Sequence, residues 1–168
     1  LLDREKLQFS HIVTHGDSED ILSSGLIVAL GEDHRRNLWA GVWGKGLVKI
    51  DMETRAVTQF RAKNGLGSDM VTGILQDQQG IMWFLTTNGL TRYNTVFKNF
   101  RVYGEQDGLP GTNFNRDAMA LLPGGRIVVG STAGLSIFDP ARIQMNLAAP
   151  DVNFTRPSSW LLPTPCGR

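Results

Sequence analysis

The chain has 168 residues and a formal net charge of +1, from 17 lysines and arginines against 16 aspartates and glutamates. This length is sufficient for one domain with a substantial core. The balanced charge, without a basic stripe, gives no electrostatic support for a nucleic-acid or anionic-membrane partner. No stretch approaches the ~18 apolar residues of a membrane helix. Cys166 is the only cysteine, which excludes an intrachain disulfide and a cysteine-cluster metal site.

Residues 1–20 are expected to be the end of a repeated unit that begins further upstream. Residues 1–3 resemble residues 49–51, and residues 7–13 resemble residues 57–60, which close the first complete unit. The chain also lacks an initiator methionine and begins within a strand-like pattern. We therefore expect it to be a piece of a larger protein.

Residues 21–64 and 65–107 are two copies of a repeat of about 44 residues, the type of period that marks repeat architectures. Three signature positions recur: Asp33, Trp39 and Gly46 of the first copy become Asp77, Trp83 and Gly89 of the second. The shifts are 44, 44 and 43 residues, because the first copy has one extra residue in the loop that contains Trp43.

Each copy is expected to form four short antiparallel strands. In the second copy these are predicted at residues 71–76, 81–86, 90–93 and 97–102, separated by turn signals. Four strands repeated at ~40–45 residues are typical of a propeller blade, whereas a β-helix would show shorter rungs. The signature aspartates precede turns and are expected to accept backbone N–H bonds there. The signature tryptophans are expected to pack between blades.

Residues 108–146 are a weaker third copy, with strands predicted at residues 114–122 and 126–130 and a third at Gly134. Leu122 replaces the signature aspartate and Val128 the signature tryptophan. Residues 147–168 are expected to begin another domain or to form a tail. The predicted fold class is therefore all-β: a β-propeller fragment with about three four-stranded antiparallel blades and a half blade at the N-terminus.

The second copy resembles the two-component regulator propeller repeat, through Leu66, Val71, Ile74, Asp77, Gly80, Trp83, Thr86, Gly89, Leu90 and Tyr93. This repeat forms the sensory region of bacterial hybrid histidine kinases and of some diguanylate cyclases, typically followed by an Ig-like Y_Y_Y domain, a membrane helix and the signalling output. The resemblance implies a non-catalytic sensory segment without a cofactor, located in the periplasm. The third copy is similar to the family's closing blade, and residues 149–155 resemble the first strand of the Ig-like domain. Residues 156–168 depart from the family.

Blade geometry places the loop before the first strand and the loop between the second and third strands on one face. Propeller ligands commonly bind on such a face, at the mouth of the central channel. These loops supply the candidate ligand-binding residues, which are Trp43, Lys45, Asp69, Asn88, Asn113, Asn115 and Arg116. An aromatic surface, charges, amides and a guanidinium fork suit an oligosaccharide or a small acidic ligand. Trp43 is the foremost candidate, because the repeat does not require it.

No catalytic residue or metal ligand is expected. The three histidines lack metal-ligand spacing, and the signature aspartates lack the second carboxylate that glycoside hydrolysis needs. A protein-interaction scaffold is the alternative function. A propeller lyase is least favoured, because a constellation of histidine and carboxylate is missing. Open propeller ends would expose apolar surface, so we also expect self-association, for instance two copies that close a pseudo-seven-bladed ring.

Overall fold

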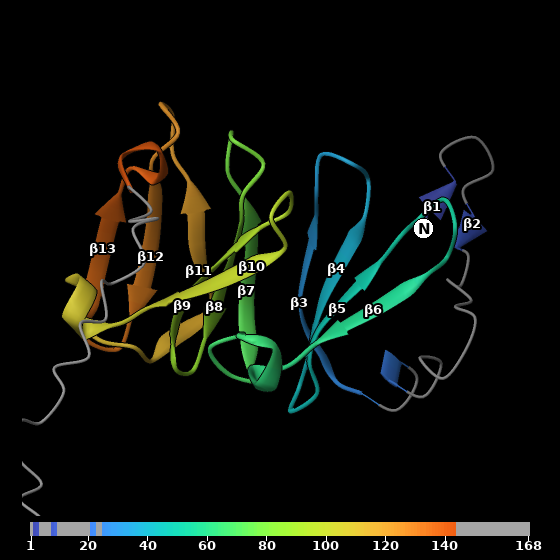
Figure 1. The fold of residues 1–168 in the computed structure, drawn as a ribbon, viewed down its shortest axis with the longest axis horizontal. Helices are drawn as coiled ribbons and strands as arrows, with labels where there is room; N and C mark the ends of the chain where they lie inside the picture. Colours follow the sequence, from blue (N-terminus) through green and yellow to red (C-terminus); the bar gives the residue numbers. More distant parts are fainter. Residues whose placement is uncertain (1, 4–7, 10–20, 23–24, 144–168) are drawn as a thin grey trace, which may run out of the picture.

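The computed structural model describes residues 2–3, 8–9, 21–22 and 25–143, and these form a row of antiparallel β-sheets (Figure 1). A short hairpin, β1 (Leu2–Asp3) with β2 (Gln8–Phe9), precedes three larger sheets. The expected all-β blade architecture is thus what the structure shows. The predicted Ig-like strand at residues 149–155 lies outside the described residues.

The first two large sheets each contain four strands in sequence order. The first sheet is β3 (Ile27–Glu32), β4 (Leu38–Val42), β5 (Gly46–Ile50) and β6 (Val57–Phe60). The second is β7 (Val71–Gln76), β8 (Met82–Thr86), β9 (Gly89–Asn94) and β10 (Asn99–Tyr103). Short 3₁₀ helices, η1 (Ala62–Asn64) and η2 (Glu105–Asp107), begin the connections to the following sheets.

The third sheet has three strands within the part of the chain that the structure describes. They are β11 (Phe114–Leu121), β12 (Ile127–Ser131) and β13 (Gly134–Phe138). Among the described residues this sheet has no fourth strand, and β13 is followed by a 3₁₀ helix, η3 (Pro140–Arg142), in place of the reversing turn that follows β5 and β9.

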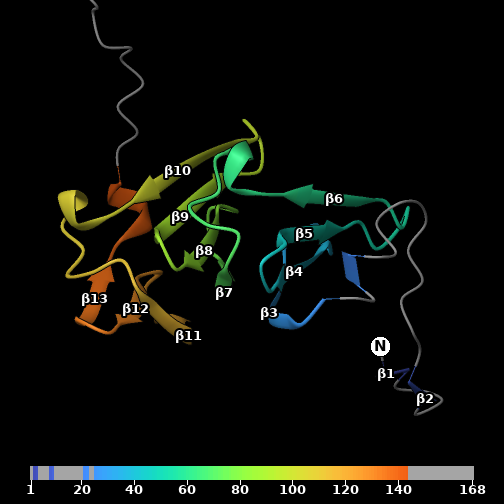
Figure 2. The same ribbon diagram turned by 90° about the horizontal axis from the view of Figure 1, so that it is seen from below.

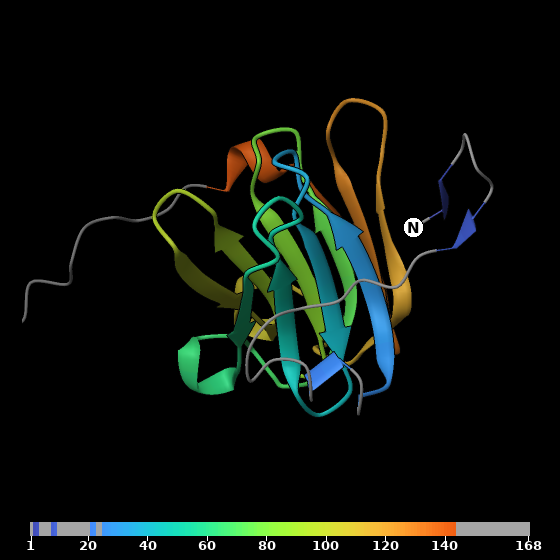
Figure 3. The ribbon, with the colours of Figure 1, turned by 90° about the vertical axis from the view of Figure 1, so that its right-hand side faces the viewer.

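The three sheets fan out from their first strands. Seen from below, β3, β7 and β11 lie next to one another, while the outer strands β6 and β10 lie on the far side (Figure 2). A view along the row places the first sheet in front of the others (Figure 3). Each sheet therefore presents one face to its neighbour, and the core lies between the sheets.

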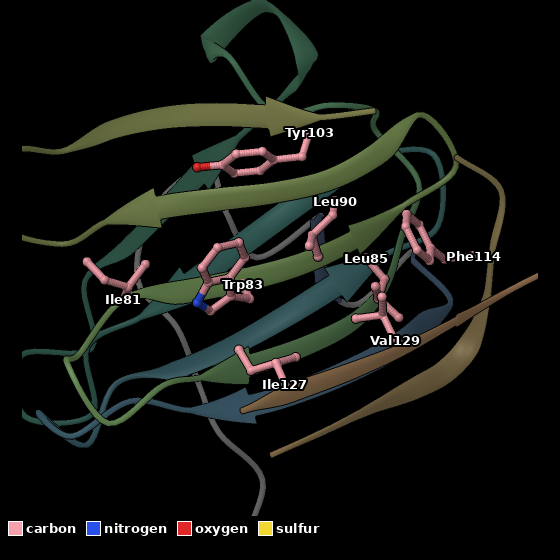
Figure 4. Close-up of a cluster of buried hydrophobic side chains, with 8 residues drawn as sticks. All are labelled: Ile81, Trp83, Leu85, Leu90, Tyr103, Phe114, Ile127 and Val129. Carbon is pink, nitrogen blue, oxygen red and sulfur yellow. The ribbon is translucent and has the colours of Figure 1, made fainter. Parts of the chain in front are cut away.

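Trp39 is buried in the first of these interfaces. Its ring lies 5.6 Å from that of Phe84 and 5.8 Å from that of Tyr93, both of the second sheet. Trp83 has the same place one sheet further on, where it packs among Phe114, Ile127 and Val129 of the third sheet (Figure 4). The predicted packing of both tryptophans between blades is confirmed. Burial of such a side chain stabilises the fold by roughly 3 kcal/mol.

Each signature aspartate holds its tryptophan in place. The Asp33 carboxylate accepts backbone N–H bonds from Arg35 and Asn37, both at 2.9 Å, and the indole N–H of Trp39, also at 2.9 Å. The predicted aspartate-to-backbone bonds are confirmed, and the bond to the indole explains why the two residue types recur together. Without this carboxylate a buried indole N–H would lose its partner.

Asp77 repeats this arrangement in the second sheet. Its carboxylate accepts the backbone N–H groups of Gln79 and Ile81, both at 2.9 Å, and the indole N–H of Trp83 at 2.8 Å. In the third sheet the turn survives, since the N–H of Leu122 donates to the Arg126 carbonyl at 2.7 Å. The backbone of this hairpin thus forms without the signature side chains.

We predict that Asp33→Ala lowers the free energy of unfolding by about 2 kcal/mol, because it leaves a buried indole N–H and two backbone N–H groups without their acceptor. Glu32→Ala is the matched control. That carboxylate belongs to an exposed ion pair with Arg36, and its loss should cost less than about 1 kcal/mol. Urea unfolding of the two variants measures both values, and equal losses would contradict the assigned role of Asp33.

Stability should also fall in acid because of Asp33. Burial alone would raise the pKa of this carboxyl, but the bonds from Trp39 and Asn37 outweigh burial and hold the pKa below its ordinary value of 3.8. A depressed folded-state pKa contributes stability that is complete above 3.8 and is lost as pH falls through the folded value. Between pH 7 and pH 2.5, the urea concentration at the midpoint of unfolding should decrease toward the acid end. The decrease should be less steep for Asp33→Asn than for the unmodified chain.

Candidate functional site

The loops expected to share one face do so, at the lower end of the sheets in Figure 1. In each blade the loop between the second and third strands bonds to the loop before the first. The three backbone bonds are Trp43 N–H to Leu26 O at 2.9 Å, Thr87 N–H to Met70 O at 3.3 Å and Thr132 N–H to Asn113 O at 3.1 Å. Neighbouring blades are joined on this face too, since Gly46 N–H donates to Asp69 O at 3.0 Å.

Trp43 and Arg116 meet on this face, although one belongs to the first sheet and the other to the third. The guanidinium carbon of Arg116 lies 5.7 Å from the centroid of the Trp43 ring, within the range of a cation–π contact. The Trp43 side chain remains 48% exposed, so its ring keeps surface for another molecule. Two of the predicted site residues are thereby brought together.

Arg116 lies in an unusually large β-bulge of β11. The first strands of the first two sheets have small bulges, where a single residue, Val28 or Thr72, lies between the paired positions. In β11 four residues, 115–118, stand opposite Gly130 of β12, and Asp117 has a left-handed φ of 55°. Enlarged bulges and such backbone conformations concentrate at functional sites, where they redirect side chains.

Asp69 is held by the protein itself. Its carboxylate accepts two bonds from the Arg61 guanidinium, at 3.0 and 2.7 Å, and one from the Ala62 N–H at 2.7 Å. Burial would raise the pKa of Asp69, but the bonds from Ala62 and Arg61 outweigh it and keep the pKa below its ordinary value. The carboxylate therefore fixes the loop, and its charge is balanced by Arg61.

Arg61 is a residue of this face that the sequence did not reveal. Besides Asp69, its guanidinium donates to the Gly44 carbonyl at 3.3 Å, in the loop that carries Trp43. No repeat signal could identify it, because the matching position of the next copy is Gly104. Arg61 links the two loops and leaves the Trp43 ring exposed.

The remaining predicted residues differ in their surroundings. The Asn88 amide donates to the Gly67 carbonyl at 3.1 Å, and therefore closes a loop. The backbone carbonyl of Lys45 accepts a bond from the Gln59 amide at 2.7 Å. Asn113 and Asn115 are exposed on either side of buried Phe114, at the start of the bulge. Asn113 and Asn115 are thus exposed amides close to Arg116 in sequence, whereas Asn88 is exposed but bonded to its own loop.

Within the described ranges, no group of three or more histidine, cysteine, aspartate or glutamate side chains is placed to hold a metal ion. In the same ranges, no helix has the length and apolar character required to cross a membrane. His34 lies on the opposite face, where its backbone N–H donates to the Gln76 side chain. Residues 11 and 15, the other two histidines, fall outside these ranges.

The candidate ligand-binding residues are expected to differ in how much they contribute to the free energy of unfolding. Asp69→Ala should lower the free energy of unfolding by about 1–2 kcal/mol, because it removes the acceptor of Ala62 N–H and the partner of Arg61. Arg116→Ala should cost less than about 1 kcal/mol, the value of an exposed cation–π contact. Chemical denaturation of both variants tests this order, and a reversed order would assign Arg116 a structural role.

Known proteins resemble this chain in part of its sequence and in its fold. Residues 65–88 match the family of the two component regulator propeller. Over 92 residues, the chain is 29% identical to histidine kinase P4 of Formosa agariphila, an alignment that covers 55% of the chain and 7% of the kinase. The residues that match the family include Asp77 and Trp83 of the second blade.

Among the solved structures that share the fold are the following two. One is the extracellular domain of a putative hybrid two-component system of B. thetaiotaomicron, with a TM-score of 0.61 and 18% identity over 69% of this chain. The other is PorZ, a surface component of the type-IX secretion system of Porphyromonas gingivalis, with a TM-score of 0.54 and 18% identity over 67% of this chain. The chain spans 17% of the length of each.

Proposed function

We propose that these blades are a ligand-sensing, non-catalytic part of a bacterial receptor of the hybrid histidine kinase type. The proposal is supported by residues 65–88, which match the two component regulator propeller, and by the similarity to a histidine kinase. We also propose that the segment lies in the periplasm, which is supported by a structural neighbour described as the extracellular domain of a putative hybrid two-component system. Because propellers host unrelated functions, the fold alone does not identify the function, and the support comes from the side chains of the loop face.

The contact of Trp43 with Arg116 is the observation that supports a ligand site. An exposed indole and a guanidinium are placed side by side from two different blades, at the ends of the inner strands. The enlarged bulge that positions Arg116 has no equivalent in the other two blades and is not required by the repeat. A local departure from a regular repeat is where function is expected to reside.

The chemistry of the pair favours an acidic sugar. A pyranose ring stacks its C–H face on an exposed indole, and a guanidinium forms paired hydrogen bonds with a carboxylate. Asp69 does not repel such a ligand, because Arg61 balances its charge. We therefore propose an oligosaccharide that contains uronic acid, or a small carboxylate derived from one, as the ligand class.

We predict that a trisaccharide of linked uronic acids binds the chain, and that its neutral counterpart binds at least tenfold more weakly. Arg116→Ala and Trp43→Ala should each weaken binding of the acidic sugar about tenfold or more, since a charge-assisted bond contributes roughly 1.5–3 kcal/mol. Titration calorimetry measures these affinities.

Arg126→Ala provides the matched control, because this arginine lies in the same sheet but at the turn between β11 and β12, on the opposite face. The affinity of the Arg126→Ala variant for the acidic sugar should equal that of the unmodified chain. Equal effects of Arg116→Ala and Arg126→Ala would contradict the site. If the chain bound no sugar, and Trp43→Ala abolished binding of a partner protein, the interaction scaffold would be favoured.

A further inference from the structure

A cavity of about 410 Å³ lies between the first and second sheets, on the face opposite the candidate ligand site. Its walls include the turn between β3 and β4 and the turn between β7 and β8, which project at the upper end of the sheets in Figure 1. Neither Trp43 nor Arg116 lines this cavity, so it is separate from the site on the loop face.

Three cationic side chains line the cavity, and each comes from a different segment. Arg35 belongs to the turn between β3 and β4, Lys49 to β5 and Lys98 to the turn between β9 and β10. The side chains of Arg35 and Lys98 are exposed and form no hydrogen bond or ion pair with another residue in the described ranges. A guanidinium fork and ammonium groups are the donors that bind oxyanions in proteins.

Lys49 is held in place by the packed interface between the sheets. Its ammonium nitrogen lies 5.8 Å from the centroid of the Trp39 ring, a cation–π distance. The indole is itself fixed, since its N–H donates to the Asp33 carboxylate at 2.9 Å. One of the three positive charges is therefore positioned before any ligand arrives.

Asp33 contributes the single carboxylate among the described residues that line the cavity. One of its oxygens accepts the Trp39 indole N–H and an Asn37 amide N–H, and the other accepts the backbone N–H groups of Arg35 and Asn37. Its acceptor positions are thus taken by the protein. Three cations against one carboxylate give the lining a formal charge of +2 with His34 neutral, and a recessed positive surface concentrates anions.

A second cavity, of about 610 Å³, adjoins the first and shares Arg35 and Lys49 with it. Asp51 and Glu53 also line this second cavity, whereas Lys98 lines only the first. The two carboxylates oppose an anion on their side of Lys49. An anion is therefore favoured in the first cavity, on the side of Lys98.

The two walls of the first cavity are tied together across the sheets. The His34 backbone N–H of the first sheet donates to the Gln76 side-chain oxygen of the second at 2.6 Å. The Gln76 amide donates in turn to the Gly80 carbonyl at 3.0 Å. The width of the cavity is thus set by the protein, which reduces the entropy lost when a ligand binds.

The repeat does not require this set of cations. Gln79 occupies the position of Arg35 in the second blade, and Ile143 that of Lys98 in the third. Only Lys49 has a cationic counterpart, because it is paired with Trp39 as Arg92 is with Trp83. A departure from a regular repeat that gathers like charges in a cavity lowers stability, and such departures are expected at functional sites.

We propose that this cavity binds a doubly charged tetrahedral oxyanion, the phosphate or sulfate group of a ligand different from the one at Trp43 and Arg116. Arg35 and Lys98 donate hydrogen bonds to its oxygens from the two facing sheets, and Lys49 supplies the third positive charge. Because the anion bridges two sheets, its binding stabilises the contact between the first and second blades. The site does not depend on the ligand proposed for the loop face.

Titration calorimetry of the full chain with inorganic phosphate and with sulfate tests the site, at an ionic strength held constant with sodium chloride. Each dianion should bind with one-to-one stoichiometry and a dissociation constant of about 1 mM or tighter. Acetate, which carries a single charge, should bind at least about tenfold more weakly. The tighter of the two dianions assigns the ester class of the ligand. Absence of saturable binding by both would overturn the proposal.

Arg35→Gln and Lys98→Gln should each weaken phosphate binding about tenfold, the loss expected for a charge-assisted hydrogen bond. Arg55→Gln is the matched control, because it removes the same charge from a turn residue that does not line the cavity. Arg55 and Lys98 also have similar left-handed φ values, 63° and 53°. Arg55→Gln should change the affinity less than about twofold. Equal losses in all three variants, with melting curves that show them folded, would mean that net charge alone attracts the anion and would overturn the proposal.

Arg116→Ala distinguishes this site from the one on the loop face. The variant should bind phosphate with the affinity of the unmodified chain, and Arg35→Gln should bind the acidic trisaccharide with unchanged affinity. Loss of phosphate binding in Arg116→Ala would place the anion on the loop face and overturn the proposal. Each of the two sites can therefore fail without the other.

Discussion

The packing of one large aromatic side chain between successive sheets is the interaction on which the rest of this structure depends. A twisted four-stranded sheet has two faces and cannot bury both by itself. Trp39 and Trp83 cover the exposed faces, because each extends from one sheet into the next, where it is almost completely buried. The aspartate that accepts the indole N–H fixes both the hairpin turn and the orientation of the ring.

This packing also explains how distant loops form one surface. Because the sheets are held at their first strands, residues from the first and third blades approach each other at the inner strand ends (Figure 2). Trp43 and Arg116 are 73 residues apart in sequence but belong to the same small region. The rigid sheets position the loops, and the bulge in β11 turns the guanidinium toward the ring.

The third blade shows what happens where the repeat weakens. Leu122 and Val128 replace the signature pair, and Leu135 and Ile137 of β13 remain exposed at 77% and 57%. The hairpins persist because their backbone bonds do not depend on the lost side chains. The self-association expected from this exposed apolar face stays a prediction.

The sequence by itself determined the repeat, the all-β sheets and the inward tryptophans, because the 44-residue period and local turn chemistry are properties of short segments. It also identified the loop face, since strand order in a blade fixes which loops share an end. Only the tertiary structure decided which candidates remain available. In the folded chain Asp69 forms an ion pair with Arg61, and the Asn88 amide donates a hydrogen bond to Gly67. Trp43 and Arg116 form a cation–π contact. These contacts depend on the number of residues in a bulge and on the approach of separate blades, and neither follows from residue type or spacing.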